Sequence, residues 1–485
     1  MQPLPLLKLS IRKKLYLLHF GIVFFLFINS SAQPTISFNQ IAGGFTAPLE
    51  IKNADDGSGR IFIAEQGGLV KIYKNGKILK KPFLDLRSQM GVDQFQGIWS
   101  IAFSPNYSSN RNFYVLYTDK RGTTALARYQ VSANNADSAV ANSAVVLLSY
   151  TVSGAGHYGD LQFGPDGYLY VSLGAGGNNK FSQNGNSDFG KILRINVDIN
   201  TAPYYSIPTD NPFVNDPNIL NEIWAIGLRN AWRYSFDKSN NDMWIPDVGQ
   251  DSVEEVNYIK PAQSLTGSNF GWQCYEGNET FKLNGCLSKD NYVFPIFEYH
   301  HDISKGGECI IGGYVYRGTA YPSLNGYYIC VDYVSANAWK IKSNGSGGWS
   351  VYFQKTGIPK GIASFGEGED GELYAVSQSL GTFYKVGANA LFSSNAFDET
   401  IAGTKKDLKS LIYPTIVNNS RIMLDLKESY NTVRIINMSG TKVFEQNISN
   451  FTGSMSLELP KLNAGMYVVE LLGRKILQQK IYVNN

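Results

Sequence analysis

The segment Gly164-Pro165-Asp166-Gly167-Tyr168-Leu169-Tyr170-Val171 combines a turn rich in Asp and Gly with a run of aromatic and β-branched residues. Gly and Asp favour tight turns, whereas Tyr and Val favour extended backbone, so the segment predicts a turn followed by a strand. Further copies of this pattern occur at residues 56–64, 109–115, 238–245, 324–329 and 369–376.

Six copies over this length leave roughly 50–65 residues for each repeat, enough for four short strands and their loops. One such sheet cannot bury both of its faces, whereas a ring of stacked sheets covers the faces and shortens the exposed edges. The repeats therefore predict an all-β fold in which residues 34–387 form a six-bladed β-propeller. The alternative is a set of unrelated hairpins in another all-β fold.

The composition agrees with this reading. The chain has 485 residues, enough for one large and one small domain, and 43% of them are apolar. Only 17% are charged, while Gly, Tyr and Phe are abundant, which favours short strands and tight turns over long helices. The net charge is only +3 and Lys and Arg form no stripe, so we expect no nucleic-acid partner.

The first residues resemble an export signal. Lys8, Arg12, Lys13 and Lys14 precede an apolar run at 15–27, and Ser30-Ser31-Ala32 offers small residues for cleavage. Residues 1–32 are therefore predicted to be a signal peptide. An uncleaved membrane anchor is the alternative, but the apolar run is short for a span and no later stretch is apolar enough. We expect no stable membrane span.

The four cysteines, Cys274, Cys286, Cys309 and Cys330, fall in one region of the exported part. Two disulfides are the natural expectation in an oxidising compartment, and we predict that nearest neighbours pair, Cys274 with Cys286 and Cys309 with Cys330. A zinc site is the alternative, although the sequence has no Cys-x-x-Cys pair.

The tail has a different pattern. A linker is predicted at 388–410, and a small Ig-like β-sandwich at 411–485, because short alternating segments are separated by turn residues. The candidate strands are 420–426, 432–438, 442–446, 454–459, 466–472 and 476–482.

Several segments of the repeats resemble the glucose/sorbosone dehydrogenase family, which includes quinoprotein aldose dehydrogenases and noncatalytic Hedgehog-interacting proteins. The resemblance covers residues 40–387 and rests on several motifs in family order. They are Phe163-Gly-Pro-Asp-Gly-Tyr-Leu-Tyr170, Phe189-Gly-Lys-Ile-Leu-Arg-Ile195, Glu222-Ile-Trp-Ala-Ile-Gly-Leu-Arg-Asn230, Asp247-Val-Gly-Gln250, Glu254-Glu-Val-Asn257 and Gly312-Gly-Tyr-Val-Tyr-Arg-Gly318.

The resemblance implies pyrroloquinoline quinone (PQQ) and calcium over the centre of the ring, with a histidine as general base. His157 lies near the family's His-x-Gly-Gly motif, but an alignment without a gap places the family histidine on Gly156. His157 becomes the predicted base only in an alignment that gives this chain a one-residue deletion relative to the family motif. A channel-lining histidine without a catalytic role is the alternative.

The resemblance also implies a set of cofactor and metal positions. Arg229, Arg317 and Lys360 would supply cations for the PQQ carboxylates, and Gln96 would lie close to the cofactor. Backbone carbonyls of Gly249 and Gln250 would hold the cofactor calcium, and Glu255 could contribute to a second calcium site. The sequence departs from the family at Phe95 and Ala175, and at Ile358 and Pro359, which weakens the polar part of the site.

The tail is similar to the type A sorting domains of the type IX secretion system. Tyr413-Pro414 opens it, Val433-Arg-Ile-Ile-Asn-Met-Ser-Gly440 follows, and Leu462-Asn-Ala-Gly-Met-Tyr-Val468 precedes the last strands, although Thr415 departs from the usual pattern. The similarity implies export by that machinery and a secreted or surface location.

Three functions remain open at this stage. The first is oxidation of an aldose sugar or similar alcohol with PQQ and calcium, with electrons passed to an external acceptor. The second is a noncatalytic propeller that binds carbohydrate or protein, and the third is a calcium-dependent hydrolase of the lactonase type. The fold alone does not distinguish these three functions, so the residues of the site have to distinguish them.

Overall fold

The computed structural model describes residues 33–91, 95–151, 159–261, 267–304, 306–389, 412–413, 416–417, 421–437, 441–463, 465–473 and 476–483. The chain divides into two compact units, Met1–Ser394 and Asn395–Asn485. Both are built from strands. The predicted signal peptide at 1–32 lies outside the described residues, as does the predicted linker except for its first two positions, which belong to a strand.

The described part of the first unit contains six sheets of four or five strands. The first sheet pairs, in order, β2 (Pro48–Asn53), β3 (Ile61–Glu65), β4 (Leu69–Lys74) and β5 (Lys77–Ile78), and β6 (Leu84–Asp85) also pairs with β4. The second sheet pairs, in order, β7 (Gly97–Phe103), β8 (Asn112–Thr118), β9 (Thr123–Val131) and β10 (Ala139–Thr151). The third pairs, in order, β11 (Leu161–Phe163), β12 (Leu169–Leu173), β13 (Lys191–Ile195), β14 (Ile223–Ile226) and β18 (Ser268–Asn269).

The other three sheets follow the same scheme. They are β15 (Ser235–Phe236), β16 (Met243–Asp247), β17 (Val253–Ile259) and β21 (Phe297–His300); β22 (Ile310–Val315), β23 (Tyr328–Asp332), β24 (Ala338–Ser343) and β25 (Trp349–Gln354); and β26 (Ile362–Glu367), β27 (Leu373–Ser377), β28 (Thr382–Asn389) and β1 (Thr35–Gly43). A separate hairpin joins β19 (Tyr275–Glu276) to β20 (Glu279–Thr280), and the short helix α1 spans Tyr107–Asn110.

Each copy of the sequence repeat lies in a different sheet and forms the turn into the second strand. These second strands are β3, β8, β12, β16, β23 and β27. Every turn holds a residue with a left-handed backbone, which Gly adopts without strain and Asn tolerates. They are Gly57 (φ 73°), Arg111 (57°), Gly167 (80°), Asn241 (64°), Gly326 (82°) and Gly371 (75°).

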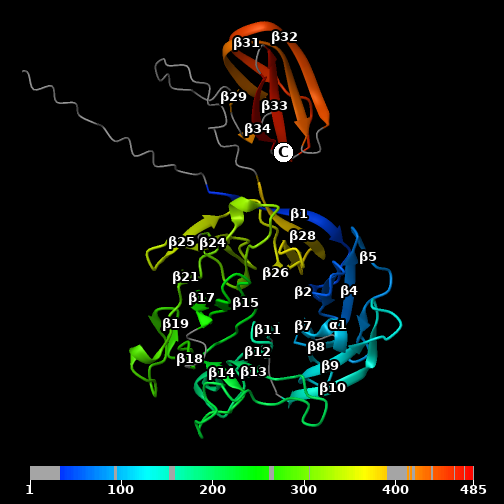
Figure 1. Ribbon diagram of the computed structural model, residues 1–485. Helices are drawn as coiled ribbons and strands as arrows, with labels where there is room; N and C mark the ends of the chain where they lie inside the picture. Colours follow the sequence, from blue (N-terminus) through cyan, green and yellow to red (C-terminus); the bar gives the residue numbers. More distant parts are fainter. Residues whose placement is uncertain are drawn as a thin grey trace, which may run out of the picture. The chain divides into compact units, whose positions relative to one another are not determined.

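The first strand of each repeat lies innermost, so β2, β7, β11, β15, β22 and β26 surround the centre of a ring (Figure 1). Contacts link β26 with β2, β2 with β7, β7 with β11, β15 with β22, and β22 with β26. The N-terminal strand β1 pairs with β28 from Thr35 to Gly43, which completes the last sheet with the start of the chain.

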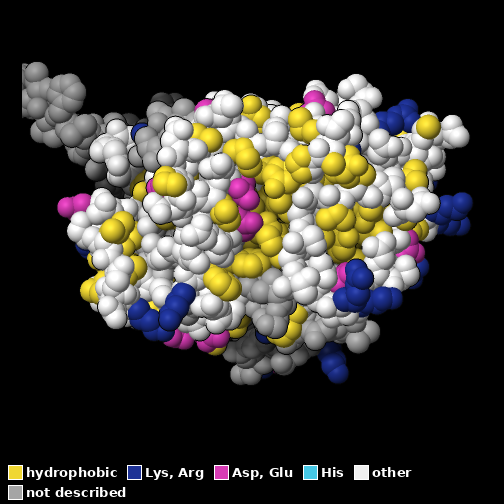
Figure 2. Space-filling model, turned by 90° about the horizontal axis from the view of Figure 1, so that it is seen from below, with side chains coloured by type: hydrophobic (Ala, Val, Ile, Leu, Met, Phe, Trp, Pro, Cys, Tyr) yellow, Lys and Arg dark blue, Asp and Glu magenta, His cyan; other side chains and the backbone are white. Residues whose placement is uncertain are grey.

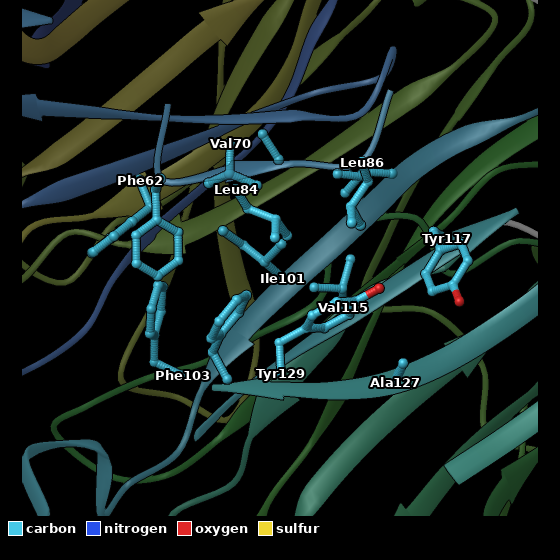
Figure 3. Packing of buried hydrophobic residues seen from close by; sticks show 14 of the residues in the cluster. Phe62, Val70, Leu84, Leu86, Ile101, Phe103, Val115, Tyr117, Ala127 and Tyr129 are labelled. Carbon is cyan, nitrogen blue, oxygen red and sulfur yellow. The ribbon is translucent and has the colours of Figure 1, made fainter. Parts of the chain in front are cut away.

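Aromatic and aliphatic side chains pack between neighbouring sheets. Phe62, Phe103 and Tyr129 are buried between the β2–β6 and β7–β10 sheets (Figure 3). Phe113 is buried in the same cluster, and its ring stacks on Tyr129. The Phe62 and Phe103 rings lie 4.4 Å apart. Each such ring contributes about 1.5–3 kcal/mol by leaving water, so the interfaces between sheets form the core.

Figure 2 shows one side of the molecule, where apolar side chains gather in a broad band and Lys and Arg lie mostly toward the margins. This face carries no basic stripe of the kind that binds nucleic acid.

One predicted disulfide is present and the other is not. Cys274 and Cys286 are bonded, whereas Cys309 and Cys330 are free thiols, so the second pairing is wrong. In the pairing of β22 with β23, Ile310 lies opposite Asp332, so Cys309 lies opposite position 333. Cys330 is three residues further along β23, which separates the two cysteines by roughly 10 Å along the strand. That distance exceeds the reach of a disulfide.

The second unit consists of one hydrogen-bonded sheet around its own core. Its strands are β29 (Ile412–Tyr413), β30 (Ile416–Val417), β31 (Arg421–Asn437), β32 (Lys442–Glu458), β33 (Gly465–Gly473) and β34 (Ile476–Val483). The predicted strands 420–426 and 432–438 are one strand here, because pairing with β32 resumes after a bulge at Tyr430. The Ig-like sandwich stays a prediction.

The described residues include no helix with the length and apolar character needed to span a membrane.

Candidate functional site

A pocket of about 290 Å³ lies where the inner strands begin. Leu49 of β2, Trp99 of β7, Ile311 of β22 and Ala363 of β26 all line it, and each stands near the start of its strand. We call this the start-side pocket. It opens on one side of the ring, at the place where loops leading into the inner strands converge.

Aromatic rings form much of the pocket wall. Phe95, Trp99, Trp232 and Tyr333 line it. Trp99 Nε1 donates to Thr118 Oγ1 at 2.8 Å, and Trp232 Nε1 donates to the Ala363 carbonyl at 2.9 Å. Both indoles are therefore fixed by hydrogen bonds, and their faces present rigid apolar surface to a flat ligand.

Amide side chains complete the wall. Tyr333 donates through its hydroxyl to Gln378 Oε1 at 2.9 Å, and Gln378 Nε2 donates to Gln66 Oε1 at 3.1 Å. The side-chain oxygen of Asn230 is buried and has no hydrogen-bond partner among the described residues. A buried acceptor of this kind calls for a donor, and a ligand hydroxyl or N–H in the pocket would supply one.

The buried carboxylate of Asp247 fixes the turn formed by Arg229 and Asn230. Asp247 Oδ2 accepts from the Arg229 backbone N–H at 2.8 Å, and Oδ1 accepts from that of Asn230 at 2.5 Å. Burial raises the pKa of Asp247 to about 7, although these two hydrogen bonds act in the opposite direction. Asp247 therefore fixes the direction in which both side chains leave the backbone.

The Arg229 guanidinium donates to neutral acceptors and lies over the Trp272 ring, 5.9 Å from its centre. Nη1 donates to the Val248 carbonyl at 2.9 Å and Nε to Gln250 Oε1 at 3.0 Å. Val248 itself lines the start-side pocket. Arg229 is not part of the pocket lining, but it bonds Val248, which is, and no carboxylate of the described residues is in direct contact with its guanidinium. An anionic ligand could therefore pair with this charge.

The neighbouring turn, which contains Gly249 and Gln250, is tied to the β19–β20 hairpin. Glu276 Oε1 accepts from four successive backbone N–H groups, those of residues 250–253, at 2.6, 2.9, 3.0 and 3.2 Å. A Cβ on Gly249 would lie 1.8 Å from the Val253 carbonyl, so only glycine fits. The turn is rigidly placed beside Arg229.

Arg233 ties the inner strands together beneath the pocket. Its Nη2 donates to the carbonyls of Leu49 and Trp99 at 2.8 and 2.9 Å, and its guanidinium lies 4.0 Å from the Trp232 ring centre. The side chain is 3% exposed. This stacked cation keeps Trp232 in place as part of the pocket wall.

The structure brings two other predicted residues to the same side of the ring but not into the pocket wall. Gln96 turns toward Gly91 and donates to the Lys120 carbonyl at 3.4 Å, while its neighbour Phe95 lines the pocket. Lys360 precedes β26 and its side chain is exposed.

Arg317 lies elsewhere, contrary to the expectation that it meets Arg229. It follows β22, whose start lines the pocket, so it is carried to the opposite side of the ring. There its Nε and Nη2 donate to the two oxygens of Asp237 at 2.7 and 2.6 Å. A paired arginine at this place cannot bind a ligand of the start-side pocket.

Glu255 is buried and already used by protein donors. It accepts from Asn257 Nδ2 at 2.7 Å and from the Gly277 N–H at 2.9 Å. Burial, and then the facing carboxylate of Asp247, raise its pKa well above the usual value. In the described part of the chain, no group of three or more His, Cys, Asp or Glu side chains is placed to hold a metal ion.

His157 lies outside the described residues, within the segment 152–158 that leads into β11. Another histidine, His301, has a structural partner: its Nε2 lies 2.7 Å from Glu254 Oε1, and this hydrogen bond raises the pKa of His301. Glu254 Oε2 accepts from the Ile310 N–H at 2.8 Å. This pair therefore fastens the start of β22.

Sequence reasoning missed Asn230, Asp247 and the two tryptophans of the pocket. Asn230 and Asp247 stand inside motifs already quoted, next to Arg229 and Gly249, so their neighbourhood was the available signal. Trp99 belongs to β7 and Trp232 to the loop before β15, so the two rings meet only when the ring of sheets forms.

Residues 45–385 match the profile of the glucose / sorbosone dehydrogenase family, and residues 411–484 match that of the secretion system C-terminal sorting domain. The HIPL1 protein of Arabidopsis thaliana is 32% identical over 59% of this chain, and the Hedgehog-interacting protein of Homo sapiens is 30% identical over 70%. The chain spans half the length of each of these relatives.

Among solved structures, the PQQ-bound aldose sugar dehydrogenase of Streptomyces coelicolor covers 74% of this chain and 99% of its own, with a TM-score of 0.56 and 20% identity. At that identity the likeness concerns the fold. The family profile itself spans well over half of the chain, from just before β2 to a point within β28. The chain therefore belongs to the glucose/sorbosone dehydrogenase family.

Proposed function

We propose that this protein is an exported oxidoreductase that oxidises an aldose sugar or a similar alcohol at the start-side pocket. The observation that carries the proposal is the Arg229-Asn230 turn. It places a positive charge without an acidic partner in direct contact, and a buried amide oxygen without a donor, at one aromatic pocket. A buried acceptor without a partner costs stability, and a ligand that donates to Asn230 would remove this cost.

The residues present suit PQQ. Its flat ring system matches the walls of Trp99 and Trp232, and its carboxylates require cations, which Arg229 and Lys360 would provide on this side of the ring. Asn230 would meet a donor of the bound group. Calcium would be held by backbone carbonyls of Gly249 and Gln250. When bound, the quinone supplies the two-electron acceptor for the alcohol.

The chain's own residues would bind the cofactor and the sugar and hold them in a fixed orientation. The fixed indoles exclude water from one face of the ligand, and the amides of Gln66 and Gln378 offer hydrogen bonds to sugar hydroxyls. Asp247 keeps the Arg229-Asn230 turn rigid, so less ordering is needed on binding. His157 remains the proposed base, and electrons would leave to an external acceptor.

A second function is favoured by one specific observation. The described pocket wall contains aromatic and amide groups but no charged side chain, which also suits a neutral carbohydrate bound without redox chemistry. The Hedgehog-interacting protein and HIPL1, the relatives with the higher identity, are not named as enzymes. In this case the pocket would bind sugar alone.

The export route and the shape of the ring are part of the proposal. The sorting-domain match at 411–484 supports transfer by the type IX machinery to the cell surface or medium, after a signal peptide at 1–32. The six sheets and their ring of inner strands support a six-bladed propeller.

The proposal is tested by titrating the purified protein with PQQ and calcium, following the quinone absorbance, and then adding aldoses with a reducible dye. We expect sugar-dependent dye reduction. Replacing Arg229 by Ala should weaken quinone binding by about tenfold or more, because one charge-assisted contact is lost. Arg87→Ala, which removes an exposed arginine paired with Asp85, is the matched control.

Three results separate the two functions. Absence of both an absorbance change and dye reduction excludes the oxidoreductase. If sugars nevertheless change the fluorescence of the pocket tryptophans, the carbohydrate-binding function stands. Equal quinone affinities of the Arg229→Ala and Arg87→Ala variants would place the quinone outside the start-side pocket.

A further inference from the structure

A second pocket lies at the opposite ends of the same inner strands. Its volume is about 380 Å³, and every inner strand contributes to its lining. The contributing residues are Lys52 of β2, Phe103 of β7, Phe163 of β11, Phe236 of β15, Tyr314 of β22 and Glu367 of β26. We call it the end-side pocket. Nothing in the proposed oxidoreductase function uses it.

Four buried charges separate the two pockets along the centre of the ring. Arg233 lies nearest the start-side pocket, Glu50 and Asp160 lie in the middle, and Lys52 lines the end-side pocket. The side chains of Arg233, Glu50 and Asp160 are 3%, 0% and 0% exposed. We call these four residues the central cluster. These buried side chains lie between residues that line the two pockets.

Lys52 is the unusual member of the central cluster. Its side chain is nine-tenths buried, yet Nζ has no hydrogen-bond partner among the described residues. The carboxylates of Asp160 and Glu50 lie 3.6 and 3.8 Å away, beyond hydrogen-bond distance. Burial acts to lower the pKa of Lys52, but these two carboxylates raise it above its usual value, so the ammonium stays charged.

Hydrogen bonding at Ser100 indicates that the central cluster carries an excess positive charge. Ser100 Oγ lies 2.9 Å from Glu50 Oε2 and 2.7 Å from Asp160 Oδ1, and it accepts from the Leu161 N–H. A hydroxyl has one proton, so it can donate to only one carboxylate. The other carboxyl must carry its own proton. Two cations then face one anion.

The charged groups around the end-side pocket do not cancel this excess. Glu367 pairs with Lys238 at 3.2 Å, and Asp237 pairs with Arg317 at 2.6 Å. Both pairs are neutral overall, and the remaining acid of the lining, Asp55, is exposed. An anion in the pocket would therefore meet the positive charge of Lys52, whose ammonium donates no hydrogen bond to the described residues.

We propose that the end-side pocket binds a small organic carboxylate whose oxygens accept hydrogen bonds from Lys52. The carboxylate would satisfy Nζ, balance the excess charge and place its carbon atoms against Phe103, Phe163 and Phe236. Apolar walls beside one buried ammonium favour an organic anion over phosphate. The volume accommodates a sugar acid.

The test is isothermal titration of the purified protein with sodium gluconate, with acetate, phosphate and neutral glucose as comparison ligands. We expect saturable binding of gluconate, weaker binding of acetate and phosphate, and none of glucose at this pocket. Lys52→Met should lower gluconate affinity by about tenfold or more, as loss of a charge-assisted hydrogen bond requires. Lys81→Met, which removes an exposed lysine that does not line the pocket, should change it less than about threefold.

Crystals of the unaltered protein soaked in gluconate give the location without any variant, in case Lys52→Met does not fold. Carboxylate density within hydrogen-bond distance of Lys52 Nζ supports the proposal. Water alone at Nζ in the soaked crystals, or gluconate binding that is equal in the Lys52→Met and Lys81→Met proteins, overturns it. Phosphate binding as tight as gluconate overturns the preference for an organic ligand.

Discussion

At the scale of single residues, the buried acids of the ring are the groups most sensitive to pH. Burial raises the pKa of Glu50 to about 7, opposed by Lys52 and then Arg233. The Ser100 contacts require a proton on one of the two facing carboxyls, which agrees with this direction. The folded chain thus keeps a proton on Glu50 that the unfolded chain releases near its ordinary pKa of 4.5.

The sign of the stability change follows directly. Between the ordinary pKa of Glu50 and about 7, the folded state binds more protons than the unfolded state, so the free energy of unfolding falls as pH rises. Glu50→Gln replaces the protonated carboxyl by an amide that does not titrate. We predict a flatter dependence of the urea midpoint between pH 5 and pH 7 in this variant. An unchanged slope, equal to that of the exposed control Glu308→Gln, would contradict the raised pKa.

The sequence located Arg229 but not its companions, for a geometric reason. Residues of one strand advance about 3.3 Å each, so the six steps from Ile311 to Arg317 carry a side chain roughly 20 Å across the ring. Ile311, which precedes the Gly312 motif, therefore lines the start-side pocket, whereas Arg317 lies on the opposite side of the ring beside Asp237. Gln96 shows the same limit at one-residue resolution, because its neighbour Phe95 lines the pocket while Gln96 itself turns toward Gly91.

At the scale of elements, the β19–β20 hairpin positions the turn beside Arg229. Glu276, at the end of β19, gathers four backbone N–H groups of residues 250–253 on one oxygen. The disulfide between Cys274 and Cys286 closes the loop that carries this hairpin. A covalent loop and one buried carboxylate thus hold a turn in which Gln250 contacts Arg229.

Removing the Glu276 carboxylate tests this arrangement. Glu276→Ala leaves the four N–H groups without their acceptor, and we predict a loss of about 1–3 kcal/mol in the free energy of unfolding, measured by urea titration. The matched control is Glu279→Ala on the same hairpin, where the side chain is 54% exposed and lies 3.9 Å from His300. Its loss should stay below about 0.5 kcal/mol. Equal losses in the two variants would show that Glu276 does not hold the turn.

The elements themselves were largely readable from sequence, because turn chemistry is local. Each repeat copy falls on the second strand of its sheet, and Gly occupies the left-handed turn position in four of the six. What sequence could not supply was pairing between distant segments. The pairing of Cys309 with Cys330 failed because ladder register, unlike chain spacing, sets the distance between the two thiols.

At the scale of the whole molecule, the cores of the two units draw on separate parts of the chain. The core of the second unit uses only residues from Ile422 onward, while the clusters of the first unit end at Ala388. Each unit therefore has a buried core of its own.

The ring of the first unit depends instead on its own N-terminal strand. β1 pairs with β28 over eight residue pairs, and Gln354 of the neighbouring sheet bonds both the N–H and the carbonyl of Ile36. Ile36 is 1% exposed. The strand thus closes the last sheet and joins it to β25, so the two ends of the propeller chain meet in one sheet.

Deleting β1 should therefore open the ring, although it removes no residue of either pocket. A chain that begins at residue 45 loses the burial of Ile36 and Phe38 and the ladder to β28, roughly 4 kcal/mol or more, and it exposes an unpaired edge. We predict a melting temperature lower by several degrees and a tendency to associate, measured by calorimetry and light scattering. Adding a synthetic peptide of residues 33–44 should restore the melting temperature, because it can pair with the same edge. A scrambled peptide of equal composition should not. If the shortened chain melts like the full chain, the N-terminal strand does not close the ring.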